Sequence, residues 1–358
     1  MMLRSMFARL VATSLVLGPG VNSELRAQLI TLGPGTTAYA LSGDGSTVVG
    51  TRASGFFRWN AAGGVQPLPL AAGSLIQNVS QDGTVVFGRN PAPNTAFRYD
   101  GQTTTFYPGV IAQAISRDGL VMTGQVQPGF HAVRWTVSEP TPVRLSLSTT
   151  TQIVASAINA DGSVIVGDQN GASGNFGMRW TAAGGVVPFG PGSPYSFAMA
   201  TDVSPDGSIV IGNGSNATGA AGFRRDASGT IEVLPHIPGQ VYAGVRGMSA
   251  DGQTLIGASG VPAVWMGSSV VSLDDFLTLH GVSSAGWIFF AIADISDDGR
   301  VLTGTGLFNG QEQAWVAVVP APGAGVFVLA AMGARRRRGS LRSRATRGSR
   351  GSRAGRSL

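Results

Sequence analysis

Neither cysteine nor lysine occurs among the 358 residues, and histidine is scarce. Without cysteine the chain has no disulfides, thiolate catalysis, iron–sulfur clusters or cysteine-ligated zinc, so we expect core packing and closure to stabilise it. The three histidines, His131, His236 and His280, match no metal-ligand spacing. We therefore predict neither a metal site nor a cofactor.

Charged residues make up only 12% of the chain, and the basic ones gather at its ends. Ten arginines lie within 335–356, whereas residues 28–319 hold 12 arginines and 18 acids. The body of the protein is therefore mildly acidic despite a formal net charge of +6. Because the positive charge lies in the terminal segments and not on a face of the body, it does not indicate a nucleic-acid interface. We therefore expect no nucleic-acid partner.

The first 27 residues are typical of a secretory signal peptide. Arg4 and Arg9 precede the short apolar stretch Leu10 to Leu17, which ends at a Gly-Pro-Gly break. A stretch of eight residues is too short to cross a bilayer. Cleavage after Ser23 or Ala27 fits the small residue at each position, so we expect a bacterial protein that is secreted or carried on the cell surface.

Residues 320–338 form a second predicted processing segment. Pro320 and Pro322 precede an apolar run, Gly323 to Ala334, and then the cluster Arg335, Arg336, Arg337 and Arg338. The arrangement resembles the PEP-CTERM sorting signal, which implies transient membrane insertion and an exosortase-type partner. Ala321 stands where that family has glutamate, and the apolar run is short. Residues 339–358 are an arginine-, serine- and glycine-rich tail, predicted to be disordered.

Between the two ends, one motif recurs seven times: an apolar residue, Ser or Asn, any residue, Asp, Gly, four residues and a closing Gly. Its aspartates are Asp44, Asp82, Asp118, Asp161, Asp206, Asp251 and Asp298. Asp-Gly between apolar runs is a strong hairpin signal. We number these copies as repeats one to seven, and we expect the aspartates to have a structural role in turns and the closing glycine to end the second strand.

Each repeat continues with a third strand, such as Phe57-Arg58-Trp59, and six repeats carry a fourth, among them Val143 to Leu147. The missing fourth strand is supplied by Gln28 to Leu32, which is predicted to complete the last blade beside Ala314 to Val319. The sequence therefore predicts an all-β fold over residues 28–319: a seven-bladed β-propeller of four-stranded blades. A β-solenoid and a propeller with another blade number are the alternatives.

The last repeat carries a family resemblance. Ala293-Asp294-Ile295-Ser296-Asp297-Asp298-Gly299, followed by Ala314-Trp315, is similar to the HAF repeat of extracellular bacterial proteins. That family frequently ends in a PEP-CTERM signal. The resemblance implies an extracellular propeller and no particular activity.

No catalytic constellation is visible. Asp297-Asp298 and Asp274-Asp275 match no calcium loop, and Asp274 is predicted to cap a short helix, Asp275 to His280. The arginines of the third strands recur so regularly that blade packing explains them better than nucleic-acid stacking. Carboxylates from different blades would still be able to form a glycosidase pair, so a hydrolase or lyase acting on extracellular polysaccharide is the alternative function.

The loops that join strands two to three and four to one share one face of a propeller and vary in length here. We call it the loop face, and the other the turn face. The longest variable segments are Asp168 to Phe176, Asn213 to Ala221 and Asp274 to Trp287. Variable loops on a rigid scaffold commonly carry function. We therefore expect a monomeric, non-catalytic surface or matrix protein that binds a glycan, polymer or protein partner on this face. If the tail is retained, binding to an anionic surface is a minor further alternative.

Overall fold

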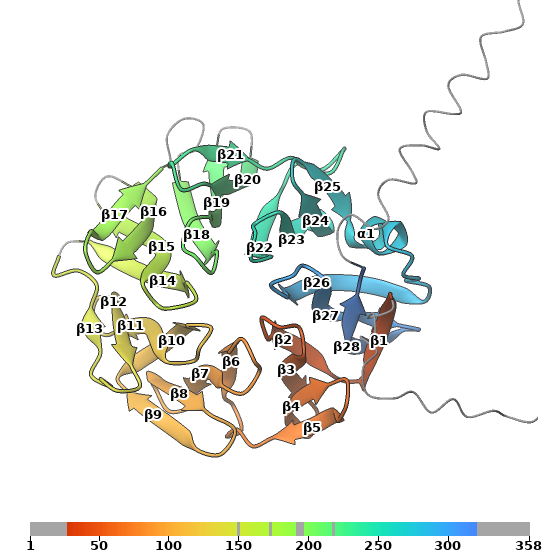
Figure 1. Cartoon of the computed structure of the whole chain (residues 1–358), viewed down its shortest axis with the longest axis horizontal. Helices are drawn as coiled ribbons and strands as arrows, with labels where there is room; N and C mark the ends of the chain where they lie inside the picture. Colours follow the sequence, from red (N-terminus) through yellow and green to blue (C-terminus); the bar gives the residue numbers. More distant parts are fainter. Residues whose placement is uncertain (1–26, 149–150, 172–173, 191–196, 217–218, 321–358) are drawn as a thin grey trace, which may run out of the picture.

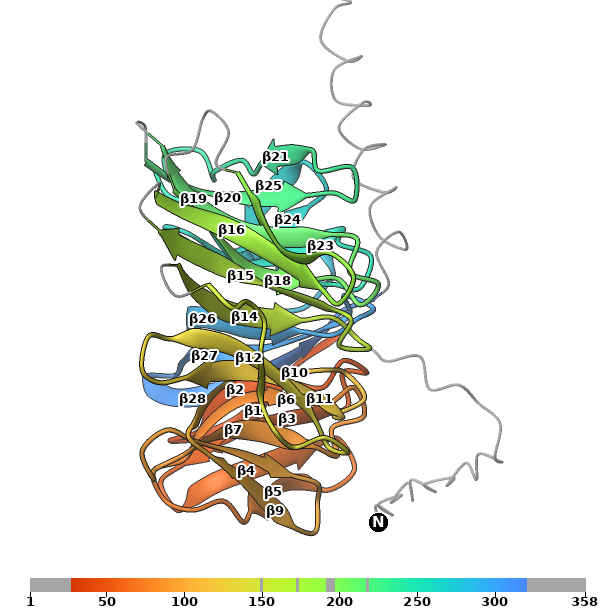
Figure 2. The same cartoon turned by 90° about the vertical axis from the view of Figure 1, so that its left-hand side faces the viewer.

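The computed structural model describes residues 27–320, apart from 149–150, 172–173, 191–196 and 217–218. Its β-sheets are arranged radially around a central axis, so the fold is a β-propeller (Figure 1). In the perpendicular view the sheets form a thick disc (Figure 2). Residues 1–26 of the predicted signal peptide, and the sorting segment and tail beyond Pro320, lie outside the described residues. Within the described part, no helix has the length and apolarity needed to cross a membrane.

Five sheets have four strands each. Four of them are built from consecutive strands: β2 (Thr37–Leu41), β3 (Thr47–Arg52), β4 (Gly55–Asn60) and β5 (Gly64–Leu68); β6 (Leu75–Val79), β7 (Val86–Asn90), β8 (Thr95–Tyr99) and β9 (Thr104–Pro108); β18 (Phe197–Val203), β19 (Val210–Asn216), β20 (Gly219–Arg225) and β21 (Ile231–Val233); β22 (Gly244–Met248), β23 (Thr254–Ser259), β24 (Val261–Met266) and β25 (Ser269–Ser272).

The fifth four-stranded sheet closes the ring. It contains β26 (Trp287–Ile295), β27 (Val301–Phe308) and β28 (Gln311–Val318), and its outer strand is the N-terminal β1 (Gln28–Pro34). The register runs antiparallel from Gln28 opposite Val318, in the manner that the strand count of the repeats predicts. Thr36 strengthens the closure, because its hydroxyl accepts a hydrogen bond of 3.0 Å from the backbone NH of Ala314.

The prediction of seven separate four-stranded blades is wrong: five blades are four-stranded sheets, and repeats three and four share one sheet of eight strands. Its strands are β10 (Val110–Ile115), β11 (Val121–Val126), β12 (His131–Thr136), β13 (Val143–Arg144), β14 (Gln152–Ile158), β15 (Val164–Gly171), β16 (Gly174–Thr181) and β17 (Gly185–Phe189).

The short strand β13 explains the shared sheet. It pairs only with Val133 and Arg134 of β12, although the sequence predicts a strand from Val143 to Leu147. Beyond this short strand the backbone NH of Leu145 donates to the Ala132 carbonyl. His131, at the start of β12, is left to pair with Ile153 of the next repeat in a parallel bridge. This single β-bridge thus joins the strands of the two repeats into one sheet.

Every innermost strand contains a β-bulge, an extra residue that has no partner in the neighbouring strand. The bulged residues of repeats one to seven are, in order, Tyr39, Gln77, Gln113, Ser156, Thr201, Arg246 and Ala293. Strand β26 of repeat seven has a second bulge, at Phe290. Each bulge lies next to the closing glycine of the motif on the second strand. A Cβ atom on that glycine would overlap a backbone carbonyl of the inner strand, as at Gly50 with Thr37 and at Gly257 with Gly244. The closing glycine therefore lies inside the second strand and does not end it, in contrast to the prediction.

The core lies between neighbouring blades, where aromatic and branched side chains of the second and third strands meet. Trp135, Trp265, Trp315, Phe57 and Phe223 are among the largest fully buried side chains. Helix α1 (Leu273–Leu279) adds Phe276 and Leu277 to the core between repeats six and seven.

The cap of α1 differs from the prediction. Ser272 is the N-cap residue, and its side chain accepts a hydrogen bond from the backbone NH of Asp275. Asp274 and Asp275 occupy the first turn, where their negative charge interacts favourably with the helix dipole. The cap is therefore supplied by a hydroxyl two residues before Asp274, the cap residue that the sequence predicts.

Replacing a bulge-facing glycine tests this architecture. We expect Gly257→Ala to destabilise the protein by about 1–3 kcal/mol, because the added methyl group has to displace the Gly244 carbonyl. Gly247→Ala is the matched control, since a Cβ there meets Ile256 at an ordinary 3.5 Å. The measurement is thermal and urea unfolding of both variants. Equal stability of the two would contradict the steric account.

Candidate functional site

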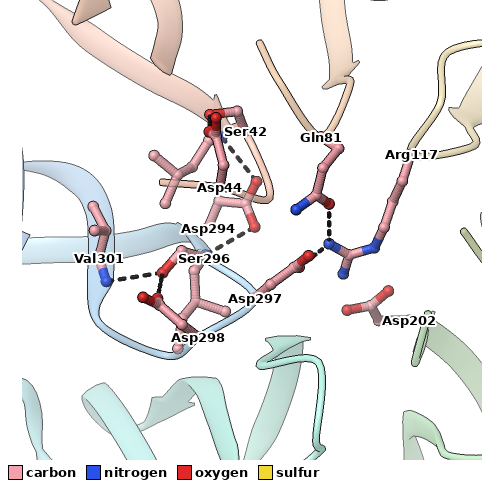
Figure 3. A network of polar contacts seen from close by, with 12 residues as sticks. Ser42, Asp44, Gln81, Arg117, Asp202, Asp294, Ser296, Asp297, Asp298 and Val301 are labelled. Atoms are coloured by element: carbon pink, nitrogen blue, oxygen red, sulfur yellow. Dashed lines mark hydrogen bonds and ion pairs between the residues drawn. The ribbon is translucent and has the colours of Figure 1, made fainter. Parts of the chain in front are cut away.

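The seven repeat aspartates lie in the turns that follow the inner strands. In repeat one the Ser42 hydroxyl donates to Asp44 over 2.6 Å and accepts from the Thr47 backbone NH, while Asp44 accepts from the NH of Ser46. Figure 3 includes this arrangement and its copy at Ser296, Asp298 and Val301. Hydrogen bonds from Thr84 and Ser80 hold the pKa of the equivalent Asp82 below its usual range. The motif residues therefore build turns, and their oxygens are already engaged.

The residue between Ser and Asp of each motif belongs to a ring of backbone hydrogen bonds around the axis. The bonds run from Asp44 to Gln81, Gln81 to Arg117, Arg117 to Ala160, Ala160 to Pro205, Ala250 to Asp297, and Asp297 to Gly43. Pro205 has no NH to donate to the next repeat. This ring ties the inner ends of the repeats together on the turn face.

The arginines of the third strands connect one repeat to the turn of the next. They donate to backbone carbonyls as follows: Arg58 to Thr84, Arg98 to Gly119, Arg134 to Gly162, Arg179 to Gly207 and Arg224 to Gly252. The regular spacing of these arginines in the sequence thus corresponds to regular contacts between repeats. Their guanidinium groups are used within the fold.

A cavity of about 490 Å³ lies on the axis, between the inner strands. Seven bulged residues line it, one from each repeat: Tyr39, Gln77, Gln113, Ser156, Thr201, Arg246 and Ala293. Asn78, Asn213, Asp202 and Asp294 complete its polar surface. Amide and hydroxyl groups of this kind both donate and accept hydrogen bonds, so the cavity is equipped to bind a polar ligand.

Two carboxylates of this cavity hold neighbouring repeats together. Asp294 accepts from the backbone NH of Leu41 over 2.9 Å and from that of Ile295 over 2.8 Å, which links repeat seven to repeat one. Asp202, at the same position of repeat five, accepts from Val203 over 2.8 Å and from the backbone of Met248 in repeat six. Burial raises the pKa of Asp202 to about 7 and that of Asp294 to about 6.

An ion pair spans the turn-face end of the channel. Arg117 of repeat three pairs with Asp297 of repeat seven and donates to the Gln81 amide oxygen over 2.8 Å (Figure 3). These repeats are not neighbours in the ring. Gly43 leaves the space for this contact, because a Cβ there would overlap the side chains of Gln81 and Arg117. The channel is therefore bridged on the turn face.

The histidines lie away from the cavity. His280 contacts the Phe276 carbonyl oxygen at the end of α1, His236 approaches that of Ala220, and His131 begins β12. In residues 27–320, leaving aside the four undescribed gaps, no group of three His, Cys, Asp or Glu side chains is arranged to share a metal ion. The structure thus brings two predicted features, Asp297 and the inner strands, to the channel, but none of the histidines.

The variable segments of the loop face are shorter as loops than the sequence predicts. Most of 168–176 and 213–221 continues the hairpins β15–β16 and β19–β20, whose registers reach Gly171 opposite Gly174 and Asn216 opposite Gly219. Asn213 is a link between repeats, because its amide exchanges two hydrogen bonds with the Val245 backbone. The cavity lining was missed in the sequence because its residues differ from one repeat to the next.

The buried carboxylates predict how stability depends on pH. Their pKa values are raised on folding, to about 7 at Asp202 and about 6 at Asp294 and Asp168, so folding favours the protonated forms. That contribution is complete below the ordinary value near 3.8 and is lost as pH rises through about 6 to 7. We expect the midpoint of thermal unfolding to fall between about pH 5 and about pH 8.

Asp202→Asn should reduce this slope, because an amide does not titrate. Asp206→Asn is the matched control: hydrogen bonds, first from Ser204, lower the pKa of Asp206, so its removal leaves the slope between pH 5 and 8 unchanged. A wild-type midpoint that rises over this interval, or an Asp202→Asn variant with an unaltered slope, would oppose the assignment.

Comparisons with known proteins identify the fold and no family. No family model and no curated protein matches the chain. Among solved structures, oligogalacturonate lyase from Vibrio parahaemolyticus is similar with a TM-score of 0.59 and 12% identity, over 84% of this chain and 96% of that one. Virginiamycin B lyase from Staphylococcus aureus is similar with a TM-score of 0.54 and 15% identity, over 82% of this chain and 99% of that one. The Cps50 (Swd1) β-propeller domain from Myceliophteria thermophila is similar with a TM-score of 0.53 and 12% identity, over 81% of this chain and 99% of that one. At such identities the chain shares with them the β-propeller fold alone.

Proposed function

We propose that this protein is an exported, non-catalytic β-propeller that binds an extracellular partner, most specifically a glycan or a similar polar polymer, in its central channel. The observation that carries this proposal is the lining of the axial cavity by one bulged residue from each repeat. Gln77, Gln113, Ser156 and Thr201 offer neutral donors and acceptors, which suit the hydroxyl groups of a sugar.

The loop face is the expected entrance. Arg117 and Asp297 bridge the turn face. On the loop face, exposed apolar side chains lie at or just before the start of inner strands: Leu75 in β6, Ile288 in β26 and Tyr242 before β22. Phe290, at the second bulge of β26, is also exposed. Aromatic surfaces beside hydrogen-bonding groups favour ligands that are apolar on one side and polar on another, as sugar rings are.

The arrangement of the channel carboxylates favours binding over catalysis. Asp202 and Asp294 accept hydrogen bonds from backbone NH groups, and Asp297 is paired with Arg117. These contacts explain the three acids as structural groups.

A protein is a further candidate as the partner that binds the loop face. We also propose that the protein is a monomer.

Export is part of the same proposal. Residues 1–27 would act as a signal peptide, and 320–338 as a sorting segment recognised by an exosortase-like enzyme. The arginine cluster Arg335 to Arg338 supports this, since arginines after an apolar run stay on the cytoplasmic side. Mass spectrometry of the secreted protein tests it: we expect neither segment in the mature chain, and a mature chain that retains both would refute it.

Binding in the channel is tested with the double variant Gln77→Ala/Gln113→Ala. We expect it to weaken binding of glycan ligands found by array screening by about tenfold or more, through loss of two hydrogen-bonding side chains. Gln102→Ala, at an exposed turn, is the matched control. Calorimetric titration of the secreted protein provides the measurement. Undiminished binding by the double variant would place the ligand elsewhere and refute the channel proposal.

A polysaccharide hydrolase or lyase is the second candidate, favoured by one observation. Burial gives Asp202 a pKa of about 7, a value suited to proton transfer near neutral pH. If the protein is such an enzyme, incubation with polysaccharides releases reducing ends or unsaturated products, and Asp202→Asn abolishes the release. The non-catalytic proposal predicts no product from any substrate that binds.

A further inference from the structure

Arg246 is the charged bulge residue of the axial cavity. The ladder between β22 and β23 pairs Val245 with Gly257 and Gly247 with Ile256, so Arg246 between them is left out of register. Its side chain is exposed and lines the cavity. Among the residues that the structure describes, no hydrogen bond or ion pair involves its guanidinium group; its positive charge acts on Asp294 only through space.

Most other arginines of the body are engaged within the fold. Those of the third strands donate to neighbouring turns, Arg89 donates to the Ala112 carbonyl, Arg117 pairs with Asp297, and Arg225 lies over the Phe189 ring. Arg246 has no comparable role, although it belongs to an acidic body. A cation that faces a cavity without a partner is a group available to an anionic ligand.

The neighbouring positions leave room around this guanidinium. In the ring of bulged residues, Thr201 of repeat five and Ala293 of repeat seven flank Arg246, and both side chains are small. The residue that follows it, Gly247, has no side chain. A planar group that approaches Arg246 from the axis is therefore not obstructed by large neighbours.

We infer that Arg246 makes the axial cavity a receptor for a carboxylated glycan, with the guanidinium group binding the carboxylate of a uronate residue. The planar fork of arginine matches the two oxygens of a carboxylate. The amides and hydroxyls of Gln77, Gln113, Ser156 and Thr201 would bind the sugar hydroxyls. This inference rests on the proposed function, since it names the ligand class of the same cavity.

The acids of the channel do not cancel this charge. Asp297 is neutralised by Arg117, and Asp202 and Asp294 direct oxygens to backbone NH groups in the walls. Burial also raises the pKa of Asp202 to about 7, so this carboxyl group is only partly ionised near neutral pH. Arg246 is thus the charge most accessible to a ligand in the cavity.

A matched pair of ligands tests the inference with the full chain as it is secreted. The probes are a trisaccharide of galacturonic acid and its fully methyl-esterified form, which differ only in the carboxylate charge. We expect the wild type to bind the acid about tenfold more tightly than the ester. The Arg246→Gln variant should bind both ligands with the affinity that the wild type has for the ester. The affinity of Arg246→Lys for the acid should lie between those of the wild type and Arg246→Gln.

Arg144→Gln is the control, because it removes the same charge from an exposed outer strand. Unfolding midpoints of all variants should agree with that of the wild type, since Arg246 makes no structural hydrogen bond. Equal affinity for acid and ester, no effect of Arg246→Gln, or tighter binding of a sulfated trisaccharide overturns the assignment of a carboxylate to Arg246 and leaves the channel proposal intact. Failure of every glycan to bind overturns both.

Discussion

In every inner strand one residue bulges out of the ladder beside a glycine of the second strand, and the rest of the channel depends on this steric arrangement. The bulge brings a carbonyl so close to the second strand that a Cβ atom has no room at Gly50, Gly88 or Gly257. The same bulge turns one side chain per repeat toward the axis. A single backbone irregularity, repeated seven times, thus both requires a glycine and creates a position whose side chain is free to vary.

Contacts between repeats convert these units into a closed ring. The glycine of each Asp-Gly turn has a positive φ and also packs against the preceding repeat, as Gly119 does against Val85, and Gly45 brings repeat one against Val301 of repeat seven. Polar groups reinforce the packing through the backbone ring on the turn face and the third-strand arginines. Asp294 and the pairing of β1 with β28 complete the closure between the two ends of the chain. Because β1 pairs with β28, the outer edge of β28 is covered where the two ends of the chain meet.

The repeat motif made much of this fold predictable, because Asp-Gly turns and β-branched runs depend on local sequence. The propeller class, the aspartate turns and the position of β1 all follow from counting such units. Other features depend on contacts between distant residues. The contact of Arg117 with Asp297 joins repeats that are not neighbours, and the union of repeats three and four results from a third-repeat outer strand of two residues. The cavity lining escapes a search for recurring residues, because the bulged position is occupied by tyrosine, glutamine, serine, threonine, arginine or alanine.

We propose that the bulged residues line a ligand-binding channel, and the cysteine-free sequence makes ligand contact at these residues directly measurable. Ser156→Cys introduces a unique thiol at a bulge, and Ser228→Cys introduces one in an exposed outer turn as a reference. The rate of reaction with a small thiol reagent is measured with and without the galacturonate trisaccharide. We expect the ligand to slow modification at position 156 and to leave the rate at position 228 unaffected. Modification at position 156 that proceeds at the same rate with saturating ligand would contradict it.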